Sequence, residues 1–133
     1  MEDTIFSKIV RGEIPCHKVY ENETTLAFLD IYPAHEGHVL IIPKVHPAEF
    51  VWDLDENTYT ALMETTRKVA LHLRSVLPYR YVKQAIVGTD VPYAHVHLVP
   101  FNEPSDTHNP GRDTVEPDHT ALAALAQRLY FTD

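Results

Sequence analysis

Residues 91–100 read VPYAHVHLVP, and the fold is organised around this stretch. Valine, leucine and tyrosine dominate it, and turn residues at 88–90 and a further proline at 104 bracket it, so we predict a β-strand. Because side chains alternate between the faces of a strand, the apolar residues at 94, 96 and 98 share one face, while His95 and His97 share the other with Tyr93. The apolar face must meet the core. Two imidazoles are therefore expected in a row on the opposite face.

This histidine row has two interpretations. Buried ring nitrogens require polar partners, so two imidazoles held on a rigid strand suggest a chemical site. The alternative is a half-exposed strand that carries two incidental polar residues. A single His-x-His does not decide between them.

A second stretch, residues 31–46 (IYPAHEGHVLIIPKVH), adds the deciding pattern. Its apolar run at 39–42 is a predicted strand, entered through Gly37 and His38 and left through Pro43. Together the two stretches resemble the histidine triad (HIT) family of nucleotide hydrolases and transferases. That family is marked by G-H before an apolar strand, then P-K-x-H, then H-x-H-x-H-x-x-P. The matching residues here are Gly37-His38, PKVH at 43–46 and HVHLVP at 95–100, and with the opening segment the resemblance covers about residues 4 to 101.

The periodicity of the remaining chain predicts an α+β fold. A five-stranded, mostly antiparallel sheet is expected to pack against one long helix at 53–77, which begins with a capping box formed by Asp53 and Glu56. Short helices are expected near both ends of the chain. The predicted segments are helices at 4–11 and 118–130, strands at 18–21, 25–30, 38–43, 81–87 and 91–100, and a polar loop at 103–112. We expect a single HIT-like domain over residues 1–133, with the motifs in a core at about 4–101 and a C-terminal loop and helix at 102–133.

Composition limits the classes of partner and the compartment. The net charge is −8, from 11 Lys and Arg against 19 Asp and Glu, which argues against nucleic acid as a partner. The sequence has no apolar run of the roughly 18 residues that a membrane span requires. A single cysteine, Cys16, cannot form an internal disulfide, so we expect a cytoplasmic protein. Outside the two motif stretches lie four histidines that we expect at the surface: His17, His72, His108 and His119.

The resemblance implies a catalytic role for three histidines. A neutral imidazole is a competent nucleophile toward phosphorus near neutral pH. By the resemblance, His95 is the nucleophile that attacks the α-phosphate and forms a nucleotidyl-histidine. His97 can donate to the phosphate oxygens or act as general acid for the leaving group. His38 is expected to lie across the sheet and to orient this cluster.

The resemblance also implies the nucleotide-binding residues. Asp30 matches an aspartate that accepts hydrogen bonds from the ribose hydroxyls, although a lone aspartate at a strand end is also often a cap. The expected binding set, with a purine nucleotide or nucleotide conjugate as the substrate, is Asp30, Phe6, Ile9, Phe28, Ile31 and Tyr93.

Three departures from the family pattern affect these expectations. Tyr93 replaces the first motif histidine, so an orienting hydroxyl can survive there but no imidazole chemistry can. The glutamine-containing loop before the motif is replaced by Gly-Thr-Asp at 88–90, and the charge of Asp90 opposes a phosphate contact. Many relatives bind a structural zinc through two N-terminal cysteines. Here Thr4 and Ser7 occupy those positions, so we predict neither a metal nor another cofactor.

Three functions follow from these patterns. The first is a hydrolase that cleaves a phosphoramidate or a dinucleoside polyphosphate at the α-phosphate through His95. The second is a hydrolase with a metal bound by His38, His95 and His97. The third is a nucleotide-binding module that has lost turnover because of Tyr93 and the altered loop. The resemblance further suggests a homodimer, formed by the fourth strands or by the long helices.

Overall fold

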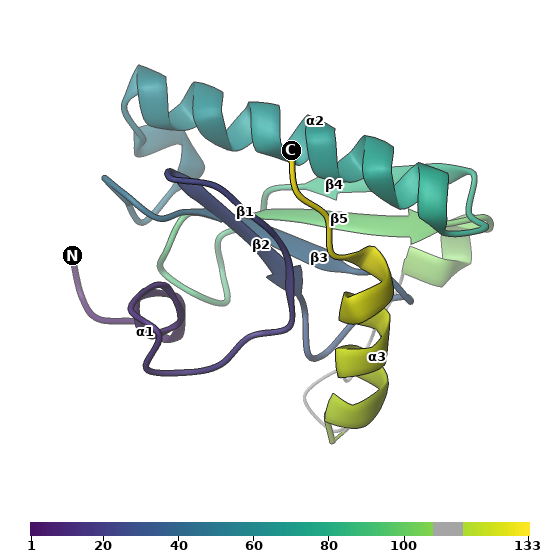
Figure 1. Ribbon diagram of the computed structural model, residues 1–133. Coiled ribbons are helices and arrows are strands. Elements are labelled where there is room, and N and C mark those ends of the chain that lie inside the picture. The colour runs from purple at the N-terminus through teal and green to yellow at the C-terminus, as the bar shows by residue number, and fades with distance from the viewer. Residues whose placement is uncertain (108–115) are drawn as a thin grey trace.

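The computed structural model describes residues 1–107 and 116–133, and its centre is an antiparallel sheet (Figure 1). The strand order is β1-β2-β3-β5-β4. The strands are β1 Lys18–Glu21, β2 Thr25–Leu29, β3 Val39–Pro43, β4 Tyr81–Ala85 and β5 Val96–Phe101. The helices are α1 Ile5–Val10, α2 Glu56–Val76 and α3 His119–Leu129, with 3₁₀ turns η1 Val51–Asp53 and η2 Pro104–Thr107. The predicted α+β class, with five antiparallel strands and one long helix, is confirmed.

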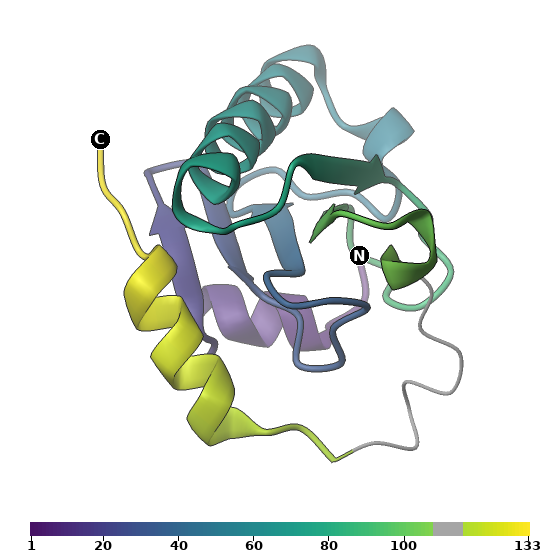
Figure 2. The same ribbon diagram turned by 90° about the vertical axis from the view of Figure 1, so that its right-hand side faces the viewer.

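Both faces of the sheet are covered, because the apolar side chains along each strand point alternately into two hydrophobic clusters. Figure 2 shows α2 on one side of the sheet and α1 on the other. The even-numbered residues of β2 and β3, among them Phe28 and Leu40, pack against Phe6 of α1. The odd-numbered residues, among them Leu29 and Ile41, pack against α2. Every residue of β2 and β3 is buried, which explains why these strands read as continuous apolar runs.

The long helix begins later than the sequence suggested. Its N-cap is Asp55, whose Oδ1 accepts a hydrogen bond from the Thr58 N–H at 2.8 Å. The predicted capping box on Asp53 is wrong, because Asp53 belongs to the preceding turn η1, which buried Val51 fixes to the core. Two aspartates precede the apolar pattern, and the packing of Val51 decided which of them caps the helix.

The histidine strand is also shorter than predicted. Strand β5 begins at Val96, so residues 91–95 lie outside the sheet ladder. The Tyr93 N–H donates to Val91 O in a tight turn, and the Ala94 N–H donates to Ala48 O at 2.8 Å. Pro92 has no N–H to offer a neighbouring strand. The segment is nevertheless extended enough that Tyr93 and His95 both contact Phe6, on the α1 side.

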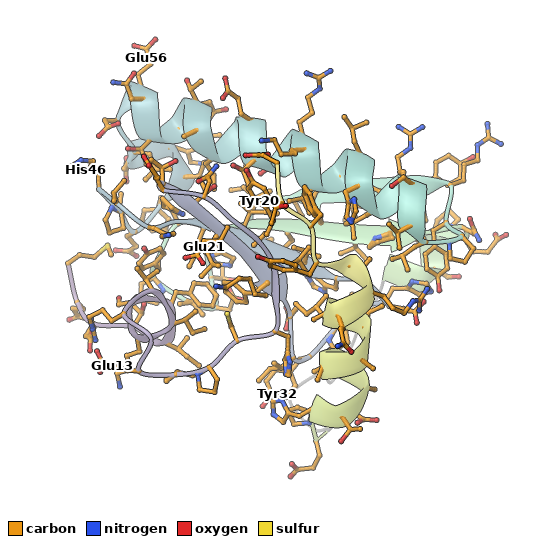
Figure 3. All side chains as sticks on the ribbon, viewed as in Figure 1. Glu13, Tyr20, Glu21, Tyr32, His46 and Glu56 are labelled. Carbon is orange, nitrogen blue, oxygen red and sulfur yellow. The ribbon has the colours of Figure 1, made fainter. Side chains whose placement is uncertain are left out.

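The C-terminal segment closes one edge of the sheet, where α3 packs against β1. Phe131 stacks on Tyr20, and Asp133 accepts a hydrogen bond from the Tyr20 hydroxyl, so Tyr20 lies between α2 and the end of the chain (Figure 3). Phe131 also stacks on His72, whose Nε2 hydrogen-bonds to the Leu129 carbonyl at 2.8 Å.

His72, expected at the surface, is half-buried, because Phe131 of the C-terminal segment stacks on its ring. Of the other histidines expected at the surface, His119 is exposed and hydrogen-bonds to half-buried His17, while His108 lies outside the described residues. Among the described helices, none is long and apolar enough to cross a membrane.

Candidate active site

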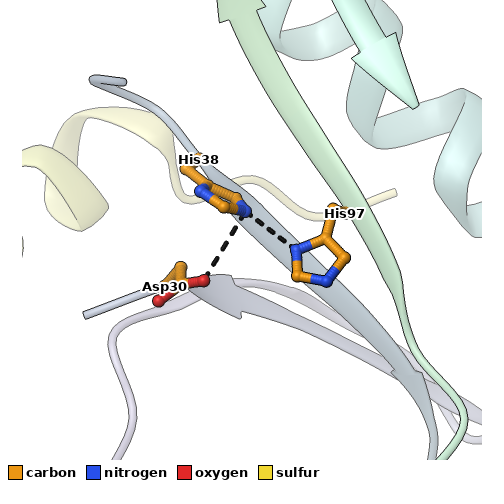
Figure 4. A group of neighbouring side chains, drawn as sticks. All are labelled: Asp30, His38 and His97. Atoms are coloured by element: carbon orange, nitrogen blue, oxygen red, sulfur yellow. Dashed lines mark hydrogen bonds and ion pairs between the residues drawn. The ribbon is translucent and has the colours of Figure 1, made fainter. Parts of the chain in front are cut away.

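Three buried polar side chains meet where β3 and β5 run side by side (Figure 4). His97 lies on β5 opposite Leu40, so its ring shares the α1 face of the sheet with His38, which immediately precedes β3. The His38 Nε2 lies 3.0 Å from His97 Nδ1 and 3.5 Å from Asp30 Oδ2. The sequence prediction that His38 approaches the motif histidines across the sheet is met by this geometry.

The hydrogen bonds of this group determine where the ring protons lie. The Ala34 backbone N–H donates to His38 Nδ1 at 3.0 Å, so Nδ1 must be an acceptor. The single ring proton of neutral His38 is therefore on Nε2, which donates to His97 Nδ1. His97 Nδ1 then accepts, and His97 carries its own proton on Nε2. A backbone amide thus fixes two imidazole tautomers in sequence.

Burial keeps His97 neutral. The pKa of His97 is lowered to about 4, and loss of hydration is the largest cause. The neighbouring His95 and His38 rings also lower this pKa, by more than the Asp90 and Asp30 carboxylates raise it. Protonating Nδ1 would also break the bond from His38. At neutral pH the ring therefore offers one N–H donor, at Nε2.

His95 presents the opposite tautomer. Its Nδ1 lies 2.7 Å from the Tyr93 carbonyl oxygen, and because a carbonyl only accepts, Nδ1 carries the proton. The Nε2 of the neutral ring then holds a lone pair. Only 2% of His95 is exposed, and Nε2 is buried without a hydrogen bond. Phe6 packs edge-on to the ring, with centroids 5.1 Å apart.

Asp90 lies close to this nitrogen without a hydrogen bond to it, a placement that the sequence did not suggest. Its Oδ1 is 3.3 Å from His95 Nε2. Burial raises the pKa of Asp90, but the adjacent His95 and its own backbone hydrogen bonds lower it more, so that it lies below the usual value. The carboxylate is therefore charged near neutral pH. It favours the presence of a proton on His95 Nε2.

Gly37 brings His38 to its place. Its backbone has φ +88°, a left-handed conformation that side chains rarely adopt. A Cβ at this position would lie 2.7 Å from Leu77 Cδ1 and 3.0 Å from Pro100 Cγ. The Gly-His pair of the motif is thus a requirement of close packing as well as of conformation.

The Tyr93 side chain stands where the family has its first motif histidine, but its hydroxyl does not hydrogen-bond to His95 or His97. Its buried hydroxyl donates to the Pro43 carbonyl, and burial raises the pKa of Tyr93 to about 12, so the hydroxyl stays protonated. The contact to His95 comes from the Tyr93 backbone carbonyl, which any residue at this position supplies. The side chain instead packs edge-on to Phe6.

The structure brings together most of the expected nucleotide-binding residues. The rings of Phe6 and Phe28 pack edge-on with their centroids 5.6 Å apart. Tyr93 belongs to the same hydrophobic cluster, and Ile9 packs against that cluster. Ile31 does not join them, because it packs against the cluster on the α2 side. Asp30 is buried beside His38, and its Oδ1 accepts the Tyr32 N–H at 2.8 Å, as a capping aspartate would.

Two groups of side chains have metal-ligand chemistry. One is Asp30, His38 and His97, and the other is Asp90, His95 and His97, with the ligand atoms of each group within 4.8 Å of one another. Both share His97, and in the first group the two imidazoles already hydrogen-bond to each other. A metal in the first group would have to replace that bond.

Comparison with known proteins points to one family. The sequence pattern of the HIT domain matches residues 11–103. An adenosine 5′-monophosphoramidase of Schizosaccharomyces pombe is 38% identical over 100 residues, which cover 72% of this chain and 72% of that protein. An adenylylsulfatase of Arabidopsis thaliana is 34% identical over 119 residues, which cover 76% of this chain and 53% of that protein. The crystal structure of a HIT-like protein from Bartonella henselae superposes with a TM-score of 0.81 at 27% identity, covering 96% of this chain and 93% of that one.

Proposed function

Because this chain belongs to the HIT family, we propose that it is a nucleotide hydrolase that releases a nucleoside monophosphate from a phosphoramidate or a dinucleoside polyphosphate. The relatives named for phosphoramidate and adenylylsulfate hydrolysis support cleavage at a nucleotide phosphate. The observation that carries the proposal is the hydrogen bond from His95 Nδ1 to the Tyr93 carbonyl, since it leaves Nε2 as the nucleophilic nitrogen.

The reaction has two steps at phosphorus. In the first, His95 Nε2 forms a bond to the α-phosphorus while the bond to the leaving group breaks, and a departing amine takes up one proton from solvent. The nucleotidyl-histidine carries positive charge on its ring, which the Tyr93 carbonyl stabilises through the Nδ1–H bond. In the second step, water attacks phosphorus and gives one proton to solvent, the bond to Nε2 breaks with its electron pair returning to neutral His95, and the monophosphate leaves.

His97 and His38 act on the phosphate oxygens in this proposal. His97 Nε2–H donates to an oxygen whose negative charge grows in the transition state, and His38 holds that donor in position through His97 Nδ1. Removing a single donor of this kind typically costs about a hundredfold to a thousandfold in turnover. The chain of bonds begins at the Ala34 amide, which holds the donor in its orientation before the substrate binds.

The nucleoside is proposed to bind on the α1 side of the sheet. Half-buried Ile9 and the buried rings of Phe6 and Phe28 form an apolar cluster next to His95 against which the purine is proposed to bind, with Asp30 as the acceptor for the ribose hydroxyls. Asp30 is supported by its place beside His38, 3.5 Å away, which brings a ribose acceptor next to the proposed phosphate site.

Two further properties belong to the proposal. We propose a homodimer, because edge strand β4 is largely exposed and carries the apolar side chain of Tyr81, and Leu71 is exposed on α2. Light scattering that gives a monomer mass at micromolar concentration would contradict it. We also propose a cytoplasmic enzyme, on the basis of the lone Cys16.

The alternative function is a nucleotide-binding module without turnover. The observation that favours it is Asp90, whose carboxylate lies 3.3 Å from the nucleophilic nitrogen and repels an incoming phosphate. If this repulsion prevails, the monophosphate binds but no phosphate bond is cleaved.

The test is release of adenosine monophosphate from an adenosine phosphoramidate and from a diadenosine tetraphosphate, with a chelator present. We compare the wild type with His95→Ala, and with His46→Asn as a control in an exposed histidine. Loss of the nucleophile should lower turnover by about a thousandfold or more, while the control keeps wild-type turnover. Release that requires an added divalent metal would support the metal hydrolase instead. Monophosphate binding without any release would support the binding module.

A further inference from the structure

The Asp90 carboxylate beside His95 has no role in the two proposed steps at phosphorus. Its Oδ1 lies 3.3 Å from His95 Nε2 and accepts the Val91 N–H at 3.0 Å, so a backbone hydrogen bond holds the carboxylate near that nitrogen. An unprotonated imidazole nitrogen and a carboxylate oxygen are both acceptors, so neither satisfies the other. A cation between them would be attracted by both, and a metal ion, unlike a proton, could also engage His97.

These two side chains and His97 make up the ligand set of a transition-metal site. The ligand atoms of Asp90, His95 and His97 all lie within 4.8 Å of one another. Two imidazoles and one carboxylate hold zinc in one class of zinc protein, with the fourth position of the ion left open. Mg²⁺ and Ca²⁺ prefer oxygen ligands, so the two imidazoles favour a transition metal over either of these ions.

Distance and burial both agree with such an ion. Two ligands of a tetrahedral zinc, with bonds of about 2.0 to 2.1 Å, lie about 3.3 to 3.4 Å apart. The separation of His95 Nε2 and Asp90 Oδ1 is 3.3 Å. Independently, His95 is only 2% exposed, and its Nε2 has no hydrogen-bond partner among the described residues. Buried polar atoms of native proteins almost always have a partner, and a metal ion would supply one here.

Access and the state of His97 make this binding reversible. The Asp90 side chain is 43% exposed, whereas His95 and His97 are buried, so an ion can reach the carboxylate from solvent. His97 must free a nitrogen in order to bind, because its Nδ1 accepts from His38 and its Nε2 carries the proton. Metal binding commonly releases a proton from a ligand, at a cost in affinity. We therefore expect weaker binding than at a structural zinc site.

We propose that Asp90, His95 and His97 bind a divalent transition-metal ion, with zinc as the best match, and that this ion reversibly inhibits the hydrolase. The inference rests on the proposed function, because it assigns an inhibitor to the same nucleophile. The single lone pair of His95 Nε2 cannot bind zinc and attack phosphorus at the same time, so the ion and the phosphate compete for it. The ion is thus an inhibitor and not a cofactor. Its ligand set contains Asp90 in place of the His38 of a metal hydrolase.

The first test measures zinc binding to the metal-free protein by calorimetry and needs no turnover. Asp90→Asn and Asp30→Asn are the matched pair, because each carboxylate belongs to one of the two groups with metal-ligand chemistry and both groups share His97. Changing a residue that only orients a ligand typically costs about tenfold to a hundredfold in metal affinity, so loss of the Asp90 ligand should cost about a hundredfold or more. Asp30→Asn should bind zinc within about twofold of the wild type.

The second test measures release of adenosine monophosphate from an adenosine phosphoramidate, with free zinc set by a metal buffer because phosphates themselves bind the ion. Zinc should inhibit the wild type with an inhibition constant equal to the calorimetric Kd, and a chelator should restore release. Asp90→Asn should need about a hundredfold more zinc for half inhibition. His119→Asn is the control for surface binding, since His17 Nε2 and His119 Nδ1 lie 2.9 Å apart, and it should change neither constant.

The two tests separate the possible failures. If the wild type releases no monophosphate at any zinc concentration, the proposed function is wrong, and the calorimetric comparison alone decides on the zinc site. If release requires added zinc, the chain is a metal hydrolase and the inhibitory role is overturned with the proposed function. Zinc affinity that is unchanged in Asp90→Asn, or lost in His119→Asn, would place the ion elsewhere and overturn the inference. Zinc that binds through Asp90 but leaves release unchanged would overturn it as well.

Discussion

Burial of His97 makes the stability of this protein depend on pH in a predictable way. In the folded chain the pKa of His97 is about 4, whereas an unfolded histidine titrates near 6.5. Between these values the unfolded state binds the extra proton and the folded state does not. The free energy of unfolding therefore rises with pH across this window, and falls as the pH drops from about 6.5 to about 4.

The magnitude follows from the difference between the two pKa values. About 2.5 pKa units, at 1.36 kcal/mol each, give about 3 kcal/mol for a side chain that is almost fully buried. This is a large share of the roughly 5 to 15 kcal/mol by which a domain is stable. The perturbation is His97→Asn, because an amide oxygen can still accept from His38 Nε2 but does not titrate.

The assay is urea unfolding of the wild type, His97→Asn and His46→Asn at several pH values between about 4 and about 7. Exposed His46 is the matched control, and its left-handed backbone at φ 52° tolerates asparagine. Between about pH 7 and about pH 4 the wild type should lose about 3 kcal/mol more than His97→Asn, and the same as the control. If His97→Asn loses as much as the wild type, then His97 is not held neutral by burial and its assignment as a fixed N–H donor fails.

Two further substitutions test the packing around the site. Tyr93→Phe should lower the free energy of unfolding by about 1 to 2 kcal/mol, because the buried Pro43 carbonyl loses its donor, while kcat/KM stays within about twofold. A large loss of turnover at unchanged urea stability would instead give the hydroxyl a catalytic role. Gly37→Ala should cost about 2 to 3 kcal/mol, through its φ of +88° and the contacts of the new Cβ with the side chains above it. Gly12→Ala is its control, since φ is +78° there and a Cβ would meet nothing within 4 Å, so equal costs in urea unfolding would show that packing at Gly37 is unimportant.

Much of the site was predictable from local sequence. The alternation of apolar and polar residues placed His95 and His97 on one face, because strand geometry depends on the backbone alone. The resemblance to the HIT family implied that His38 lies near them, and the structure places His38 Nε2 3.0 Å from His97 Nδ1. These inferences depend on period and order, which one sequence contains.

The errors came from segments whose conformation depends on distant contacts. Residues 91–95 have strand-like composition, yet the Ala94 N–H is taken by Ala48, outside the sheet. Asp53 has the side chain of a helix N-cap, yet it is the last residue of turn η1. His72 resembles a surface residue until the C-terminal segment, some 57 positions later, covers its ring.

The sequence by itself determined the fold class, the order of the motifs and the three histidines on one side of the sheet. Only the tertiary structure decided which nitrogen of each ring carries the proton and that the Asp90 carboxylate lies 3.3 Å from His95 Nε2. The physical reason is that side-chain direction along a strand is set within a few residues. A tautomer or an ion pair is instead set by whichever group the folded chain brings within about 3 Å.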